Sequence, residues 1–304
     1  MKEDFQPVST YKVSPEYEGV RLDNCLISKL KGLPRAKIYS IIRKGEVRVN
    51  KSRCKPSYRL QLEDVIRIPP YTTKQKVNKK SSEVNKEKIE RSILRKEKDF
   101  LIINKPAGIA CHGGSGISLG LIETIRQLDK KYIDAQLVHR IDRDTSGCLV
   151  VALKKSILRE FHKEIRNKYV DKIYTAVVKG EWPKDLQKVT LSIKKETLKS
   201  GKRIVKANEK GKISETEFKL ISSGKCNSLI EAKIITGRTH QIRVHSSYKG
   251  YPIVGDIKYG DAIYNKQIQS KGLKRMLLHA TSINFKNLEI EQSAPIPEVF
   301  SKYV

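Results

Sequence analysis

Residues 139–154 read HRIDRDTSGCLVVALK, a polar and turn-prone nonapeptide followed directly by an apolar run. The run at 148–154 has the length and the valine and leucine content that are typical of a buried β-strand. Loop residues mounted on a rigid strand are common positions for catalytic side chains. From charge alone, however, a plainer interpretation is favoured, in which Asp142 pairs with Arg140 or Arg143 and the residues that follow it form a tight turn.

Other strand-like runs surround this stretch, at residues 100–104, 172–180, 188–195 and 227–237. Helices are expected between them. Residues 157–165 carry apolar side chains at four-residue spacing after Ser156, a good N-cap, and a second helix is expected over 239–250. Because strands and helices do not alternate regularly, residues 92–304 are predicted to form an α+β domain with a mixed, mostly antiparallel sheet.

The N-terminal part of the chain is predicted to be a separate small module. Leucines recur every four residues over 22–30 and stop at Gly32, which indicates a short helix. A second helix is expected over 34–45, with an isoleucine stripe, and short strands follow before Pro69-Pro70. We expect residues 1–18 to be an N-terminal extension, 19–70 this module, and the polar residues 71–91 a flexible linker to the larger domain.

The charge of the chain points to a polyanionic partner. Its 304 residues contain 62 Lys and Arg against 33 Asp and Glu, a formal net charge of +29, and the surplus is spread along the chain. Residues 19–70 alone carry 13 basic and 4 acidic side chains, a net of 13 − 4 = +9. A generally lysine-rich composition is the alternative, but a distributed excess favours a nucleic-acid surface. The candidate phosphate contacts in the module are Arg35, Lys37, Arg43 and Lys44.

Several classes of protein are disfavoured by the same inspection. No apolar run approaches the roughly 20 residues of a membrane-spanning helix, and the polar start MKEDFQPVST is unlike a signal peptide. The five cysteines are scattered without a C-x-x-C pair, and His240 and His245 lack the glutamate of a zinc-binding H-E-x-x-H motif. We expect a cytoplasmic, monomeric protein without a metal, a disulfide framework or a membrane partner.

Four motifs in order resemble the RluA family of pseudouridine synthases. Residues 139–147, HRIDRDTSG, match its H-R-L-D-x-x-T-S-G signature apart from Ile141. The other matches are NKPAG at 104–108, KIYTA at 172–176 and TGRTHQIRVH at 236–245. The run from Val20 to Pro70 is similar to an S4 RNA-binding domain, which precedes the catalytic domain in one branch of that family. The pairing of this run with HGGSGISLGLIE is closest to a branch that modifies large-subunit ribosomal RNA.

The resemblance implies a function that composition could not supply. It implies the isomerisation of specific uridines to pseudouridine in large-subunit (23S) ribosomal RNA, with no small-molecule cofactor. Asp142 would be the catalytic carboxylate and Arg243 its salt-bridge partner. Tyr174 would lie against the uracil, and Arg140 would fill the gap that the extruded nucleotide leaves.

Each of these roles has a plainer alternative. Tyr174 could be a core aromatic of its strand, Arg140 a local partner of Asp144, and Arg243 a phosphate contact on a basic helix. For the whole chain, the first alternative is an S4-bearing ribosome assembly or RNA-binding factor without catalysis. The second is a metal-dependent nuclease, which the lack of clustered carboxylates and histidines disfavours.

Overall fold

The computed structural model describes residues 3–30, 32–74, 81–114, 119–197 and 203–304. The chain divides into two compact units, Met1–Asn78 and Lys79–Val304. The division falls within residues 75–80, which lie outside the described residues.

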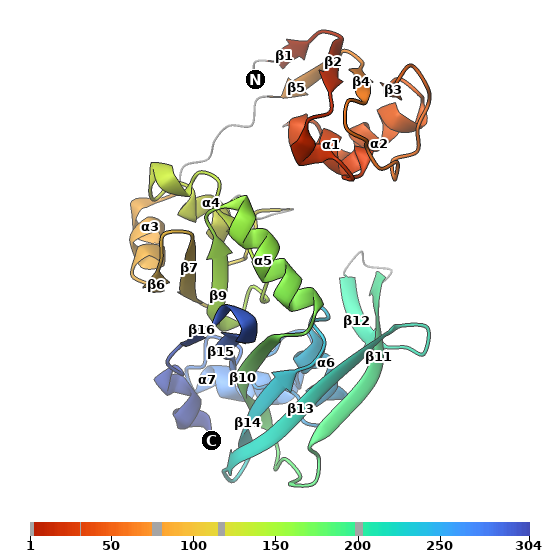
Figure 1. The fold of residues 1–304 in the computed structure, drawn as a ribbon. Helices are drawn as coiled ribbons and strands as arrows, with labels where there is room; N and C mark the ends of the chain where they lie inside the picture. Colours follow the sequence, from red (N-terminus) through yellow and green to blue (C-terminus); the bar gives the residue numbers. More distant parts are fainter. Residues whose placement is uncertain (1–2, 31, 75–80, 115–118, 198–202) are drawn as a thin grey trace. The chain divides into compact units, whose positions relative to one another are not determined.

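The first unit packs two helices and a small sheet around one apolar core (Figure 1). Strands β2, β4 and β3 form a three-stranded antiparallel sheet, and β1 pairs with β5. Ile38, Ile41 and Ile42 bury the predicted stripe of the second helix. The elements are β1 Glu3–Gln6, β2 Ser9–Lys12, η1 Pro15–Tyr17, α1 Leu22–Lys29, α2 Arg35–Arg43, β3 Arg48–Val49, β4 Val65–Ile68 and β5 Tyr71–Lys74.

Two predicted segments at the edges of this unit were wrong. The supposed extension 1–18 contains β1 and β2, which hydrogen-bond to β5 and β4 and so belong to the unit. The supposed flexible linker 71–91 begins with β5 and ends with helix α3, Glu83–Glu90. Its few apolar side chains explain the error, because Ile89 alone is enough to seat α3 in the core of the second unit. Only residues 75–80 of that segment lie outside the described residues.

The second unit is built on an 11-stranded sheet of described residues, with the order β12-β11-β13-β14-β10-β15-β9-β7-β6 and with β16 and β8 added beside β15 and β9. All pairings are antiparallel except β15 with β9, so the predicted mixed, mostly antiparallel sheet is confirmed. The strands are β6 Ile93–Lys96, β7 Phe100–Lys105, β8 Gln136–Leu137, β9 Ser146–Ala152, β10 Val170–Lys179, β11 Lys188–Thr197, β12 Arg203–Ala207, β13 Lys212–Ser223, β14 Asn227–Ile234, β15 Leu278–Phe285 and β16 Ile290–Ser293.

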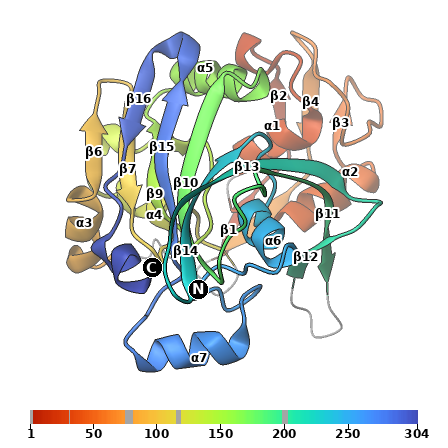
Figure 2. The ribbon, with the colours of Figure 1, turned by 90° about the horizontal axis from the view of Figure 1, so that it is seen from below.

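Helices cover both faces of this sheet. Helix α5 places Phe161 between Phe100 and Phe285 on one face, with ring centroids 5.6 and 4.7 Å away. On the other face α3, α4 and α6 share a core with alternate residues of β7, β9 and β10. Figure 2 shows α6 within the curve of β11 and β13. The helices are α4 Leu121–Ile125, α5 Lys155–Arg166, α6 Gln241–Tyr248, α7 Ala262–Ser270, and the short η2 Lys130–Tyr132, η3 Lys286–Leu288 and η4 Glu298–Tyr303.

Strand β9 explains why the apolar run at 148–154 is continuous instead of alternating. Every residue of Ser146–Ala152 is buried, because Val150 contributes to the core beneath α5 and Val151 to the core on the other face. Continuous apolar sequence is typical of such doubly covered strands. At its start, Gly147 has φ +110°, and an added Cβ would lie 2.1 Å from the carbonyl oxygen of Ala280 on β15. Glycine therefore permits the parallel pairing that sets the preceding loop against β15.

The predicted strands at 100–104, 148–154, 172–180, 188–195 and 227–237 all exist, as β7, β9, β10, β11 and β14. The helix expected after Ser156 is α5, but its N-cap is Lys154, whose backbone is extended. Ser156 therefore lies inside the first turn, and that cap was wrong. The helix expected over 239–250 is α6, Gln241–Tyr248.

Candidate active site

The loop before β9 forms the floor of a cleft of about 870 Å³. Asp142 lies in this loop, between β8 and β9, and its backbone carbonyl accepts a hydrogen bond from the amide of Thr145 at 3.2 Å, which closes a turn. The Cys111 thiol donates to the carbonyl of Ile141 at 3.2 Å on the other side. Asp142 keeps 24% of its side chain exposed, so the carboxylate remains accessible from the cleft.

A buried lysine fixes this loop from below. Lys105, at the end of β7, is fully buried, and its ammonium donates to the carbonyls of Pro106 and Ile109 at 2.8 Å and to that of Arg143 at 2.9 Å. Burial lowers the pKa of Lys105 to about 8. Three carbonyl acceptors satisfy its three donors, so the lysine ties the 106–109 turn to the loop that carries Asp142.

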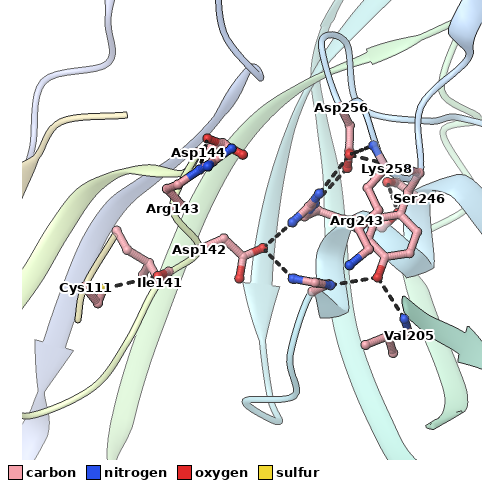
Figure 3. A network of polar contacts seen from close by, with 12 residues as sticks. Cys111, Ile141, Asp142, Arg143, Asp144, Val205, Arg243, Ser246, Asp256 and Lys258 are labelled. Carbon is pink, nitrogen blue, oxygen red and sulfur yellow. Dashed lines mark hydrogen bonds and ion pairs between the residues drawn. The ribbon is translucent and has the colours of Figure 1, made fainter. Parts of the chain in front are cut away.

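Arg243 joins two carboxylates from different parts of the chain (Figure 3). It lies on α6 and donates from Nη1 to Asp142 Oδ2 at 2.7 Å. Its Nε and Nη2 donate to the two oxygens of Asp256 at 2.7 and 2.8 Å, a bidentate pair. Asp256 also accepts from the backbone amides of Lys258 and Tyr259 at 2.9 and 3.1 Å. The guanidinium is thus held by one carboxylate and presented to the other.

The ionisation of this group follows from its contacts. Burial acts against the charged form of Arg243, but hydrogen bonding and charge from Asp256, and then from Asp142, raise its pKa overall. Burial likewise acts to raise the pKa of Asp256, but the hydrogen bonds and charge of Arg243 outweigh it and lower that pKa. The pair therefore stays charged although Asp256 is only 1% exposed.

His240 approaches Asp142 from the other side. Its Nε2 lies 3.8 Å from Asp142 Oδ2, and its Nδ1 is 2.7 Å from the hydroxyl of Tyr259. That hydroxyl accepts the amide N–H of Val205 on β12 at 2.9 Å. Burial lowers the pKa of His240, against the charge of Asp142. Asp142 is therefore bordered by Arg243 and by a histidine that favours its neutral form.

The structure brings the four residues predicted for the catalytic site to one cleft. Asp142, Arg243, Tyr174 and Arg140 all line it. Tyr174 on β10 is 8% exposed, and burial together with the charge of Asp142 raises the pKa of its phenol, which stays neutral. Arg140 is exposed, and Asp144 pairs with Arg143 at 3.1 Å instead of with Arg140.

The residues proposed for RNA contact in the S4-like module lie on and just after α2. Arg35, Lys37, Arg43 and Lys44 are all exposed. They belong to the first unit, whereas every residue that lines the cleft belongs to the second.

Sequence reasoning missed Asp256 and Tyr259. Asp256 lies in a short segment with no motif of its own, and only the fold brings its carboxylate to Arg243. The sequence carries no signal for it: the φ of +78° at Gly255, and the 2.3 Å between an added Cβ there and the carbonyl oxygen of Arg275, are seen only in the structure.

The described ranges hold neither a candidate metal site nor a candidate membrane-spanning helix. No group of three or more His, Cys, Asp and Glu side chains there could hold a metal ion. No described helix is long and apolar enough to cross a membrane.

Comparison with known proteins identifies the family. A family model described as RNA pseudouridylate synthase matches residues 99–248, and an S4 domain model matches 20–66. A protein of Pasteurella multocida named Ribosomal large subunit pseudouridine synthase C is 47% identical over 284 residues, which cover 93% of this chain and 87% of that protein. The chain belongs to the RNA pseudouridylate synthase family. The Escherichia coli protein of the same name is 43% identical over 289 residues, covering 94% and 91%.

Solved structures agree with this pseudouridine synthase fold. Human RNA Pseudouridylate Synthase Domain Containing 4 has a TM-score of 0.59 and 26% identity, covering 72% of this chain and 93% of the human chain. Human RNA Pseudouridylate Synthase Domain Containing 1 has a TM-score of 0.56 and 27% identity, covering 67% and 82%. The predicted family, S4 domain and class of enzyme are confirmed, and a binding factor without catalysis and a nuclease are both disfavoured.

The buried pair makes a prediction about stability. Asp256→Asn should lower the free energy of unfolding of the second unit by roughly 3–5 kcal/mol near neutral pH, because Arg243 loses its bidentate partner. The folded-state pKa of Asp256 lies below its ordinary value, so its stabilisation is present above about pH 4 and is lost as the pH falls further. The difference in the free energy of unfolding between wild type and Asp256→Asn should therefore be constant above about pH 5 and become smaller below about pH 4.

Urea unfolding followed by the fluorescence of Trp182 measures this difference, because Trp182 is the one tryptophan of the chain and lies buried in the second unit. Asp129→Asn is the matched control, since Asp129 forms an exposed pair with Lys131 and should produce no comparable loss. The role given to Asp256 would be contradicted if the difference in the free energy of unfolding were unchanged at pH 3. It would also be contradicted if Asp129→Asn lost as much stability as Asp256→Asn.

Proposed function

We propose that this enzyme converts specific uridines of large-subunit ribosomal RNA to pseudouridine, with Asp142 as the catalytic carboxylate. The observation that carries the proposal is the accessible carboxylate of Asp142, held at 2.7 Å by Arg243 in a cleft shared with Tyr174. The names of the relatives from Pasteurella multocida and Escherichia coli support large-subunit ribosomal RNA as the substrate.

The reaction requires a carboxylate and a confining cleft, and its atoms balance without a co-reactant. The bond from ribose C1′ to uracil N1 breaks, the base turns, and C1′ bonds to C5. The proton on C5 leaves, and N1 gains a proton. No electrons are exchanged, so the proposal needs no redox cofactor, and we expect none.

Asp142 would act on the ribose or base of a uridine extruded into the cleft. Arg243 fixes the direction of its carboxylate, because one guanidinium nitrogen bonds to Asp142 while two others are anchored by Asp256. Such fixed charges stabilise a reacting group without reorganisation during the reaction. We regard Arg243 as a positioning residue and Asp142 as the catalytic one.

Tyr174 and Arg140 would handle the extruded nucleotide. Stacking of a base on an aromatic ring is worth about 1–3 kcal/mol, and a neutral, buried phenol at the cleft wall suits that contact. Extrusion costs a few kcal/mol of lost stacking in the RNA. Arg140 is exposed at the mouth of the cleft and can fill the gap or contact a phosphate.

The first unit would provide a separate RNA-binding surface. Its S4 domain carries a net +9 over residues 19–70, which suits phosphate binding. Large-subunit ribosomal RNA as substrate would place the enzyme in the cytoplasm, and one copy of each unit in a monomer is sufficient for this proposal.

Asp142→Asn tests the catalytic role. The amide keeps the size and much of the hydrogen-bonding capacity of the side chain but removes the charge, so we expect a folded protein that binds RNA and loses at least about 1,000-fold of its pseudouridine formation. Product analysis of ribosomal RNA after single-turnover reaction measures the loss. Asp144→Asn is the control: Asp144 pairs with Arg143 on the surface, and its loss should change the rate less than about fivefold. Near-wild-type activity of Asp142→Asn would refute the assignment.

The S4 domain makes a second prediction. Replacing Arg35, Lys37, Arg43 and Lys44 with Gln should weaken RNA binding and flatten its salt dependence, because each lost phosphate contact lowers the slope of log K against log salt by roughly 0.7–0.9. The chemical rate at saturating enzyme should stay within about threefold of wild type, since tethering adds affinity without touching the reacting base.

The matched control for this variant removes four exposed lysines that line no part of the cleft, namely Lys266, Lys271, Lys274 and Lys302. It has the same net charge as the test variant. Equal changes of the salt slope in both would mean that total charge matters and that α2 is no RNA contact.

A further inference from the structure

Part of the lining of the cleft has no role in the proposed chemistry. These residues, here called the arm, lie where α5 ends, where β10 begins and just before Arg140. They are Val138, His139, His162, Ile165, Lys168, Val170 and Lys172.

Lys172 is the unexplained group of this arm. It is half-buried on β10, and among the described residues its ammonium has no hydrogen bond or ion pair. Burial is the cause that lowers its pKa, with no carboxylate to offset it. A partly buried charge without a partner costs free energy, so Lys172 lowers the stability of the fold unless a ligand supplies the partner.

The acidic and basic groups around Lys172 leave the arm positive. Asp171 also lines the cleft, but Lys233 and Lys286 pair with it at 3.1 and 3.2 Å. His139 accepts the amide N–H of Val150 at 3.2 Å, and burial, followed by the charge of Lys172, lowers its pKa to about 3. It is therefore neutral and adds no charge.

Two further cations complete the arm. Lys168 lies in the turn between α5 and β10 with φ +62°, and its exposed side chain lines the cleft. Arg140, which follows His139 in the chain, lines the same cleft. Neither side chain has a hydrogen bond or ion pair within the described part of the chain. Three cations with no hydrogen bond or ion pair among the described residues thus line one cleft, and such a group suits an anion with several oxygens.

We propose that this arm binds a phosphodiester group of the RNA strand beside the target uridine, with Lys172 as its main contact and Lys168 and Arg140 at its sides. The inference rests on the proposed function and adds a site to it. Lys172 and Tyr174 line the same cleft from one strand and are two residues apart on it, on either side of a shift in the register of β10 with β15. The base on Tyr174 and a neighbouring phosphate on Lys172 would then be held from a single strand.

Lys172→Met tests the site because it keeps the length of the side chain and removes its charge. The variant should bind a large-subunit ribosomal RNA stem-loop, chosen for tight binding to wild type, about tenfold more weakly, as expected for one lost charge-assisted contact. Its melting temperature should equal or exceed that of wild type, because the unpaired ammonium no longer has to be buried. A structural lysine would lower the melting temperature instead, and that result would overturn the proposal.

The phosphate itself is located with stem-loops that carry one neutral methylphosphonate linkage at each position around the uridine in turn. At one position, the neutral linkage should weaken binding to wild type about tenfold and leave Lys172→Met unaffected. Lys172→Arg keeps the cation and should retain most of that sensitivity. Lys302→Met, an exposed lysine outside the cleft, should respond to every linkage as wild type does.

The site would be refuted if, at every linkage position, the loss of binding free energy from the methylphosphonate added to the loss from Lys172→Met. It would also be refuted if Lys172→Met bound the RNA with wild-type affinity. The failure of the proposed function is seen separately. If wild type binds the stem-loops but forms no pseudouridine in ribosomal RNA, the proposed reaction is wrong. The comparison of methylphosphonate effects on wild type and Lys172→Met still tests the phosphate site in that case.

Discussion

The guanidinium of Arg243 is the group on which the rest of the site depends. It connects helix α6 with Asp142, 101 residues earlier in the chain, and with Asp256, 13 residues later. Burying an ion pair costs desolvation and seldom adds stability by itself. Here the cost is tolerated because three hydrogen bonds of 2.7–2.8 Å leave Arg243 little freedom, and Asp142 is thereby fixed while one quarter of its side chain faces the cleft.

The fold supplies the rigidity that this arrangement needs. Strand β9 is buried on both faces, so the loop before it starts from an immobile base. Lys105 fastens the loop to the neighbouring turn through three carbonyls. On the opposite wall, Val244 of α6 packs with Ile193 and Val205 of the β11–β12 hairpin. The two sides of the Asp142–Arg243 contact also share one core, because Ile141 and Ile242 belong to the same buried apolar cluster.

The features of this structure that could be predicted were those encoded by short, continuous stretches of sequence. Strands such as β7 and β9 were evident because their apolar runs are continuous, and α2 because its isoleucines recur at helical spacing. Asp142, Tyr174 and Arg243 were identified by resemblance to a family, since charge alone favoured a plain surface turn. Asp256 was not predictable, because its role arises only from tertiary proximity. The linker was misjudged for a related reason: a polar segment can still dock through one side chain, Ile89.

The central claim is that Asp142 reacts only when the guanidinium of Arg243, bonded to Asp142 and to both oxygens of Asp256, orients it. Arg243→Lys tests this most directly, because lysine keeps the positive charge but cannot bond to Asp142 and both oxygens of Asp256 at once. Isomerisation releases the hydrogen of uracil C5, so tritium release from ribosomal RNA labelled at that carbon reports the reaction. In single-turnover experiments at saturating enzyme, the account predicts a rate at least about 100-fold below wild type with RNA binding retained. A rate close to wild type would contradict it.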